Sequence, residues 1–191
     1  DGGKNLDYYV SFTDNTSGKI VYETTLKPSM WAKMERRYLT DITVEVKHKD
    51  KTVEKINILE HFRGKKVFIC FESKSLGDTL AWIPYCEKFR IKYGCEVIVS
   101  TFMNQFFEKS YPELKFVGRG IVVENIAGMF ELGWFYDKKK EPKHPATIPL
   151  QQAATNILNL DYLFIPTSLS FLTRPIIAFV YVVASAILIY R

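Results

Sequence analysis

The pattern of hydrophobic and polar residues changes its period near Gly64. Before this point, short runs alternate apolar with polar residues, as at Ile42, Val44 and Val46, and this alternation is typical of half-buried strands. The runs come in two pairs, each joined by a polar loop, which is the pattern of a hairpin. Residues 1–63 are therefore predicted to form a small β-rich domain of four antiparallel strands.

After Gly64, strands alternate with helices. Val67–Phe71 is rich in β-branched and aromatic residues and predicts a strand buried on both faces. A polar turn follows, and then a helix over about residues 79–93 that Gly94 ends. Further strands are expected at 96–100, 114–117 and 121–123, and further helices at about 102–109 and 149–158. This alternation predicts an α/β fold, with a Rossmann-like parallel sheet over residues 64–162.

The first turn of this unit carries the candidate chemistry. Ligands of parallel α/β sheets bind outside the carboxyl ends of the strands, and the turn over residues 72–78 lies there. Asp78 ends the turn, and its carboxylate could cap the helix, with Gly77 permitting a sharp bend. The same carboxylate could serve as a general base, because a capping aspartate still presents its second oxygen to a substrate. The local residues leave both interpretations open.

Composition and charge narrow the class of protein. With 47% hydrophobic and 15% aromatic residues, the chain has ample material for a core. The net charge of +5 is scattered along the chain without a nucleic-acid motif, so nucleic acid is not an expected partner. The cysteines are odd in number and fall at apolar positions, which predicts free thiols in a reducing, cytoplasmic compartment; they are Cys70, Cys86 and Cys95. The histidines lack ligand spacing, so no metal site is predicted.

A set of short strings resembles one family of enzymes. The string SLGDTL at residues 75–80, placed after the first strand of the α/β unit, resembles the N-terminal signature of heptosyltransferases. The longer string at 71–89 is similar to a narrower group, the bacterial autotransporter strand-loop-strand O-heptosyltransferases. Further strings that resemble this group follow in order at 97–102, 111–114, 133–136 and 148–154. The resemblance covers residues 5 to 162.

The resemblance implies a GT-B glycosyltransferase that transfers a heptose to serine hydroxyls of an autotransporter adhesin. Asp78 would be its catalytic base. Neighbouring residues of the same turn would bind substrate; these are Lys74, Ser75, Gly77 and Thr79. The co-substrate would be an ADP-activated heptose, and the acceptor a passenger polypeptide. The resemblance also implies a ring-like homo-oligomer, and an iron site built from cysteines of a C-terminal region that these residues do not include.

The last residues depart from the family pattern. In the family, this region should lead into a second Rossmann domain that binds the nucleotide sugar, so we expect a truncated chain that is inactive alone. Pro175–Tyr190 is a run of sixteen uncharged residues within an atypical apolar tail, residues 163–191. As a helix it would span about 24 Å, short of the roughly 30 Å hydrocarbon core. Foreign sequence is the expected origin of the tail, and a membrane anchor is the alternative. Two other classes stay open, a non-catalytic acceptor-binding module and a membrane-tethered protein.

Overall fold

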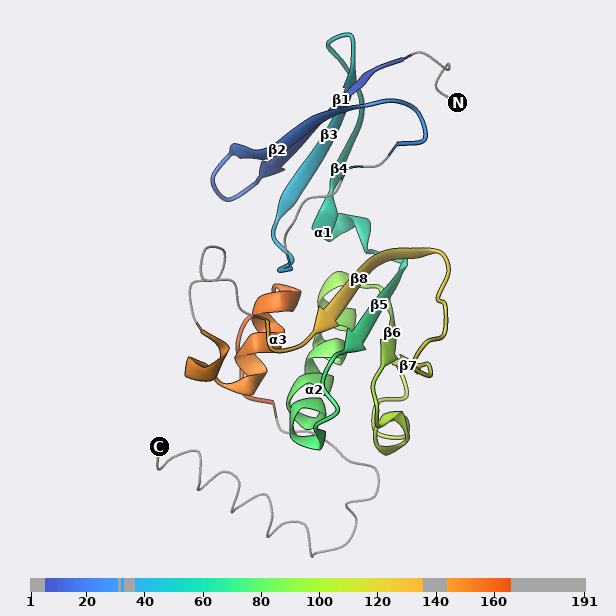
Figure 1. Cartoon of the computed structure of the whole chain (residues 1–191), viewed down its shortest axis with the longest axis vertical. Coiled ribbons are helices and arrows are strands. Elements are labelled where there is room, and N and C mark those ends of the chain that lie inside the picture. The colour runs from blue at the N-terminus through green and yellow to red at the C-terminus, as the bar shows by residue number, and fades with distance from the viewer. Residues whose placement is uncertain (1–5, 31, 33–36, 136–143, 166–191) are drawn as a thin grey trace, which may run out of the picture.

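The computed structural model describes residues 6–30, 32, 37–135 and 144–165. Within these residues the chain forms two four-stranded sheets, one antiparallel and one parallel. The antiparallel sheet lies at the top of Figure 1 and the parallel sheet below it. The α/β class predicted from the sequence is confirmed.

The antiparallel sheet contains the four strands predicted from the alternating runs. They are β1 (Tyr8–Asp14), β2 (Lys19–Leu26), β3 (Ile42–His48) and β4 (Lys51–Asn57). Their order is β2-β1-β3-β4. The Asp14 carboxylate accepts bonds from the Thr16 and Ser17 N–H groups at 2.9 and 3.1 Å, which closes the first hairpin loop.

A short helix joins the two sheets. Asn57 ends β4 and begins α1 (Ile58–His61), because its side chain accepts bonds from the backbone N–H groups of Leu59 and Glu60 at 2.9 and 3.2 Å. The sequence predicted strands and loops, without a helix, over this part of residues 1–63. The helix at Ile58–His61 corrects that prediction.

The parallel sheet has the order β7-β6-β5-β8. Its strands are β5 (Lys66–Phe71), β6 (Glu96–Ser100), β7 (Lys115–Phe116) and β8 (Ile126–Leu132). Every pairing between them is parallel. The predicted strand at Val67–Phe71 is confirmed, and β5 lies between β6 and β8. Its predicted burial on both faces is only partly met, because Phe68 and Cys70 are half-buried.

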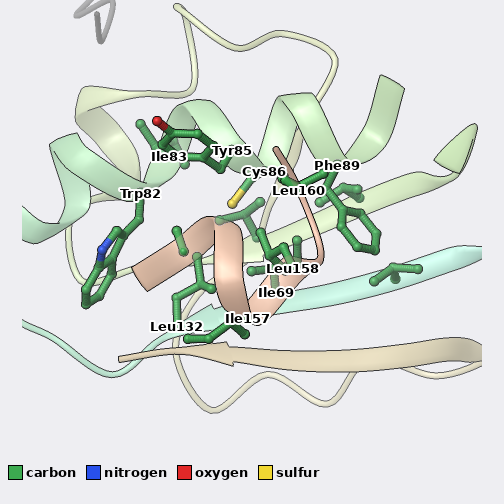
Figure 2. Packing of buried hydrophobic residues seen from close by; sticks show 14 of the residues in the cluster. Ile69, Trp82, Ile83, Tyr85, Cys86, Phe89, Leu132, Ile157, Leu158 and Leu160 are labelled. Carbon is green, nitrogen blue, oxygen red and sulfur yellow. The ribbon is translucent and has the colours of Figure 1, made fainter. Parts of the chain in front are cut away.

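Two helices cover one face of the parallel sheet. They are α2 (Leu76–Tyr93) and α3 (Leu150–Leu158). Figure 2 shows both helices over β5 and β8, with Ile69, Cys86, Leu132 and Ile157 packed between. Gly94 ends α2 as the sequence predicted, and it adopts a left-handed conformation at φ 60°.

Three predicted elements need correction. The helix expected at 102–109 is only a 3-10 turn, η1 (Asn104–Phe106), because the Asn104 side chain bonds Thr101 and the Val117 carbonyl and competes with helical bonding. The strand expected at 121–123 is absent from this described loop, and Val122 is 83% exposed. β8 follows instead, and a second 3-10 turn, η2 (Pro145–Thr147), precedes α3.

The third correction concerns the start of α2. The helix begins at Leu76, three residues earlier than predicted, and Ser75 is its N-cap. The Ser75 Oγ accepts from the Asp78 N–H at 3.4 Å. Serine is as good a cap as aspartate, so Ser75 can take this role three residues before Asp78. The interpretation of Asp78 as the N-cap is therefore wrong.

The chain after α3 runs beside α2, in orange-red in Figure 1. We call residues 159–165 the ribbon segment. Alternate carbonyl oxygens of this segment accept bonds from side chains of the two helices; the pairs are Tyr93 and Lys92 to Asn159, Lys88 to Asp161, Tyr85 to Leu163, and Gln151 to Ile165. The side chains of residues 161–164 are exposed. The segment is therefore held by its backbone.

The predicted boundary at residue 63 runs through shared core. Leu39, in the loop before β3, donates its N–H to the Ile157 carbonyl at 2.9 Å, and its side chain is buried with α2 and α3. Phe62 lies against Phe89 and Tyr93. The division into domains at 1–63, 64–162 and 163–191 stays a prediction.

The apolar tail falls mostly outside the described residues. Those residues end at Ile165, so the predictions for the rest of the tail lie beyond them. In the part of the chain that the structure describes, no helix is long and apolar enough to cross a membrane.

Candidate functional site

Asp78 lies in the first turn of α2, at the carboxyl end of β5. Its side chain is mostly buried, at 8% exposure. The Oδ2 atom accepts a hydrogen bond from the Trp134 indole Nε1 at 2.9 Å. Among the described residues, no backbone N–H donates to this carboxylate. The carboxylate is thus held by one side chain, and it does not accept the capping hydrogen bond of the helix.

Trp134 packs against a row of aromatic rings that are tilted or edge-on to one another. It follows β8, and its ring centre lies 6.2 Å from that of Trp82 on α2. Trp82 is fully buried, packs edge-on to Phe71 at the end of β5, and donates its own Nε1 to the Leu150 carbonyl at 2.9 Å. Trp134 itself is 42% exposed. Trp134, the donor to Asp78, is therefore partly exposed at the surface and packs on the buried Trp82 side chain.

A second carboxylate reaches the same edge of the sheet. Glu72 follows β5 directly, and its backbone N–H donates to the Leu132 carbonyl at the end of β8, at 2.9 Å. Its Oε2 occupies the space that a side chain on Gly133 would fill. Because Gly133 and Trp134 are consecutive, Glu72 and Asp78 contact neighbouring residues of one loop. Two carboxylates are therefore candidates for acid–base chemistry at this edge.

The predicted substrate-binding residues divide into two groups. Lys74, Ser75 and Gly77 are exposed in the turn before α2. Thr79 is fully buried, and its hydroxyl donates to the Ser75 carbonyl at 2.9 Å. The structure thus brings three of the four to the surface beside Asp78, and places the Thr79 hydroxyl inside the helix turn. Binding of substrate by these residues stays a prediction.

None of the cysteines is poised as a nucleophile. All three are free thiols, two of them buried and Cys70 half-buried. Burial raises the pKa of the Cys95 thiol to about 11, and it also raises the pKa values of Cys70 and Cys86. A thiol with a raised pKa carries little thiolate at neutral pH. Asp78 and Glu72 therefore stay the candidates for acid–base chemistry at this edge.

No role was predicted from the sequence for Trp134 or Glu72, although Glu72 lies in the turn 72–78 and Trp134 in the string 133–136. Trp134 and Glu72 lie just after the ends of the adjacent parallel strands β8 and β5. A reading of residues 126–132 as a strand would have placed the following Gly133-Trp134 pair at the carboxyl edge. The short apolar run of that stretch was the available signal.

Comparison with known proteins now bears on this site. Aah, an autotransporter heptosyltransferase of Escherichia coli, is 30% identical over 112 residues, 58% of this chain and 28% of Aah. This chain is homologous to the autotransporter heptosyltransferases. TibC of E. coli O78:H11 (strain H10407 / ETEC) is 22% identical over 111 residues, and so is BAHTCr of Citrobacter rodentium. The matched part is 27% of either relative's length. No family model matches the chain.

Solved structures show the same fold. The crystal structure of TibC, an iron-containing dodecameric glycosyltransferase from enterotoxigenic E. coli H10407, matches with a TM-score of 0.76 at 18% identity. The match covers 88% of this chain and 45% of that chain. TibC in complex with ADP-D-β-D-heptose also matches with a TM-score of 0.76, at 17% identity. The chain therefore has the fold of about half of a TibC subunit.

Proposed function

We propose that this chain is the acceptor-side half of a GT-B protein O-heptosyltransferase. The donor would be an ADP-activated heptose, and the acceptor would be a serine hydroxyl of an autotransporter adhesin. The observation that carries the proposal is the Asp78 carboxylate, held by Trp134 at the carboxyl end of β5 in a fold that matches TibC. Homology to heptosyltransferases supports the reaction class.

The proposed reaction is a displacement at the anomeric carbon. The serine oxygen forms a bond to that carbon while the bond to the diphosphate breaks, and the nucleoside diphosphate leaves with the electron pair. The serine proton passes to Asp78, the general base. The Trp134 N–H bond to Oδ2 restricts rotation of the carboxylate, so that Oδ1 is the oxygen that accepts the proton. Lys74, Ser75 and Gly77 would bind the substrates at this turn.

Other parts of the enzyme would complete the site. We propose that transfer needs a donor-binding half with a second nucleotide-binding unit. The acceptor-side half described above would be inactive without it. The comparison with TibC supports this division, because this chain covers 45% of that chain. An assembly of several copies in the cytoplasm, as a homo-oligomer, belongs to the same proposal.

Iron does not fit the residues described here. TibC is an iron-containing protein. Across residues 6–30, 32, 37–135 and 144–165, no group of three or more His, Cys, Asp or Glu side chains could hold a metal ion. Cys86 and Cys95 are buried among apolar residues of the core. No step of the proposed reaction is therefore assigned to a metal in this chain.

The base assignment can be tested in a chimera in which this chain replaces the matching part of TibC. Transfer of heptose from ADP-D-β-D-heptose to an adhesin passenger would be measured by mass spectrometry. We expect Asp78→Asn to slow transfer by about a hundredfold to ten-thousandfold, the usual contribution of a general base. Asp50→Asn removes the same charge from the turn between β3 and β4 and should leave the rate unchanged.

A companion variant identifies the carboxylate that acts. Glu72→Gln should leave most of the activity, because Asp78 keeps its bond to Trp134. Loss of transfer in Glu72→Gln together with normal transfer in Asp78→Asn would move the base to Glu72. An inactive chimera with native residues at both positions would count against the proposed function.

A further inference from the structure

Two cations flank one aromatic ring at the carboxyl edge of the parallel sheet. Arg119 follows β7, and its Cζ lies 4.0 Å from the centre of the Phe102 ring. Lys74 belongs to the turn after β5, and its Nζ lies 5.5 Å from the same centre. Phe102 itself follows β6. Three loops that are separate in sequence therefore bring these residues to one place.

The Arg119 guanidinium is held in a defined orientation. Its Nη1 donates a hydrogen bond to the carbonyl of Phe71, the last residue of β5, while the Phe102 ring lies against it. A guanidinium has five N–H donors, so this single bond leaves most of them for another acceptor. The group is thus oriented before any ligand arrives, which reduces the entropy lost on binding.

Neither cation is neutralised by the described part of the chain. Lys74 is exposed and makes no hydrogen bond or ion pair there. Arg119 is also exposed and has no acidic partner among the same residues. Two uncompensated positive charges beside an aromatic ring suit a ligand with several anionic oxygens.

The position of the cations suits one part of the proposed reaction. Asp78 contacts Trp134 after β8, whereas Lys74 and Arg119 contact Phe102 after β6. The turn after β5 therefore has the carboxylate on one side and the cations on the other. The N-terminus of α2, which begins at Leu76, adds positive potential between them. Negative charge that develops on a leaving diphosphate needs such cations.

We propose that Lys74 and Arg119, held beside Phe102, bind the diphosphate of the nucleotide-activated donor. The identity of this ligand rests on the proposed function, whereas the anion site rests on the geometry alone. The acceptor-side half thus contributes to stabilising the leaving group as well as supplying the base.

The test measures binding of inorganic pyrophosphate to the 191-residue chain by isothermal titration calorimetry. We expect Arg119→Gln and Lys74→Gln each to weaken binding by about tenfold or more, because each removes a charge-assisted bond. Lys66→Gln is the matched control, since it removes an exposed positive charge at the opposite end of β5 and should leave the affinity unchanged. The affinity for ADP should be weakened by Arg119→Gln and Lys74→Gln and unchanged by Lys66→Gln.

Each outcome decides for or against the site. Within the described residues Lys74 makes no hydrogen bond or ion pair and approaches the Phe102 ring, so the effect of Lys74→Gln stands even if Arg119→Gln loosens the loop. Absence of binding by the native chain, or equal weakening by all three variants, overturns the proposal. A loss confined to Lys66→Gln would place the anion in the pocket of about 370 Å³ that Lys65 and Lys66 line, which also overturns it. Binding of pyrophosphate as expected, together with a chimera with native Asp78 that transfers no heptose, would support the anion site and overturn the proposed transfer reaction.

Discussion

Gly133 lets the chain leave β8 in close contact with two side chains. A Cβ at this position would collide with the Glu72 Oε2 and would lie 2.7 Å from Phe135 Cζ. The Glu72 carboxylate can swing away, but the Phe135 ring is half-buried and has the Arg37 guanidinium 4.0 Å from its centre. We expect Gly133→Ala to lower the free energy of unfolding by about 1–3 kcal/mol, the usual cost of overpacking.

Urea unfolding followed by circular dichroism measures this change. Gly118→Ala is the control, because a Cβ there would lie 3.7 Å from its nearest neighbour, an ordinary contact. Its effect should stay within about 0.5 kcal/mol. Equal losses in the two variants would show that the space beside Gly133 is not tight.

At the level of single residues, the sequence identified Asp78 but not its partner. Asp78 could be found because it stands in a turn between a strand and a helix, and both neighbours are local in sequence. Trp134 lies 56 residues later, and its contact with Asp78 depends on β8 pairing beside β5. The pairing of strands that are distant in the chain was not predictable from local periodicity. The partner of the carboxylate was therefore beyond the sequence pattern.

Two tyrosines of α2 connect helix and ribbon segment in a pH-dependent way. Burial raises the pKa values of Tyr85 and Tyr93 to about 12, from about 10 in an unfolded chain. The folded state thus favours the protonated phenol, which is the form that donates to the Leu163 and Asn159 carbonyls. This stability is fully present below about pH 10 and is lost as the pH rises towards about 12.

Tyr93→Phe tests this linkage. At pH 8 the variant should lose about 1 kcal/mol, the worth of one hydrogen bond. Between about pH 10 and 12 its stability should fall less steeply than that of the native chain, because one titrating group is gone. Urea unfolding at several pH values gives both curves, and curves that run parallel would contradict the assignment.

At the level of elements, the sequence predicted most of what local patterns determine. Val67–Phe71 and Gly94 were placed correctly, since a short apolar run and a C-terminal glycine are local signals. The 121–123 run is apolar and β-branched, as a strand would be, but no strand of the described sheets pairs with it. β8 takes the place beside β5 instead. Propensity alone could not decide which apolar run found a partner.

For the whole molecule, the question is whether the two sheets unfold together. Leu39 precedes the antiparallel strand β3 but is 8% exposed in the core that α2 and α3 share. We expect Leu39→Ala to lower the free energy of unfolding by about 2–4 kcal/mol, because it leaves a cavity at this junction. Met30→Ala, at a residue that is 59% exposed, should change it by less than about 0.5 kcal/mol.

Two probes separate the possible results. In a Trp31→Phe background, fluorescence of Trp82 and Trp134 reports on the parallel sheet, and circular dichroism reports on both sheets. If the sheets form one cooperative unit, both probes should give one transition, and Leu39→Ala should shift them together. Separate transitions would support an independent domain at residues 1–63.

The ribbon segment is held through its main-chain carbonyls, which limits substitution in the helix more than in the segment itself. Every amino acid carries a backbone carbonyl. Substitutions at residues 161–164, whose side chains are exposed, therefore keep these hydrogen bonds. The donors Tyr85, Lys88 and Lys92 have no such freedom, because each one bonds a carbonyl of the segment. Among homologous chains, natural selection should therefore retain hydrogen-bond donors along this face of the helix while the segment that they hold diverges.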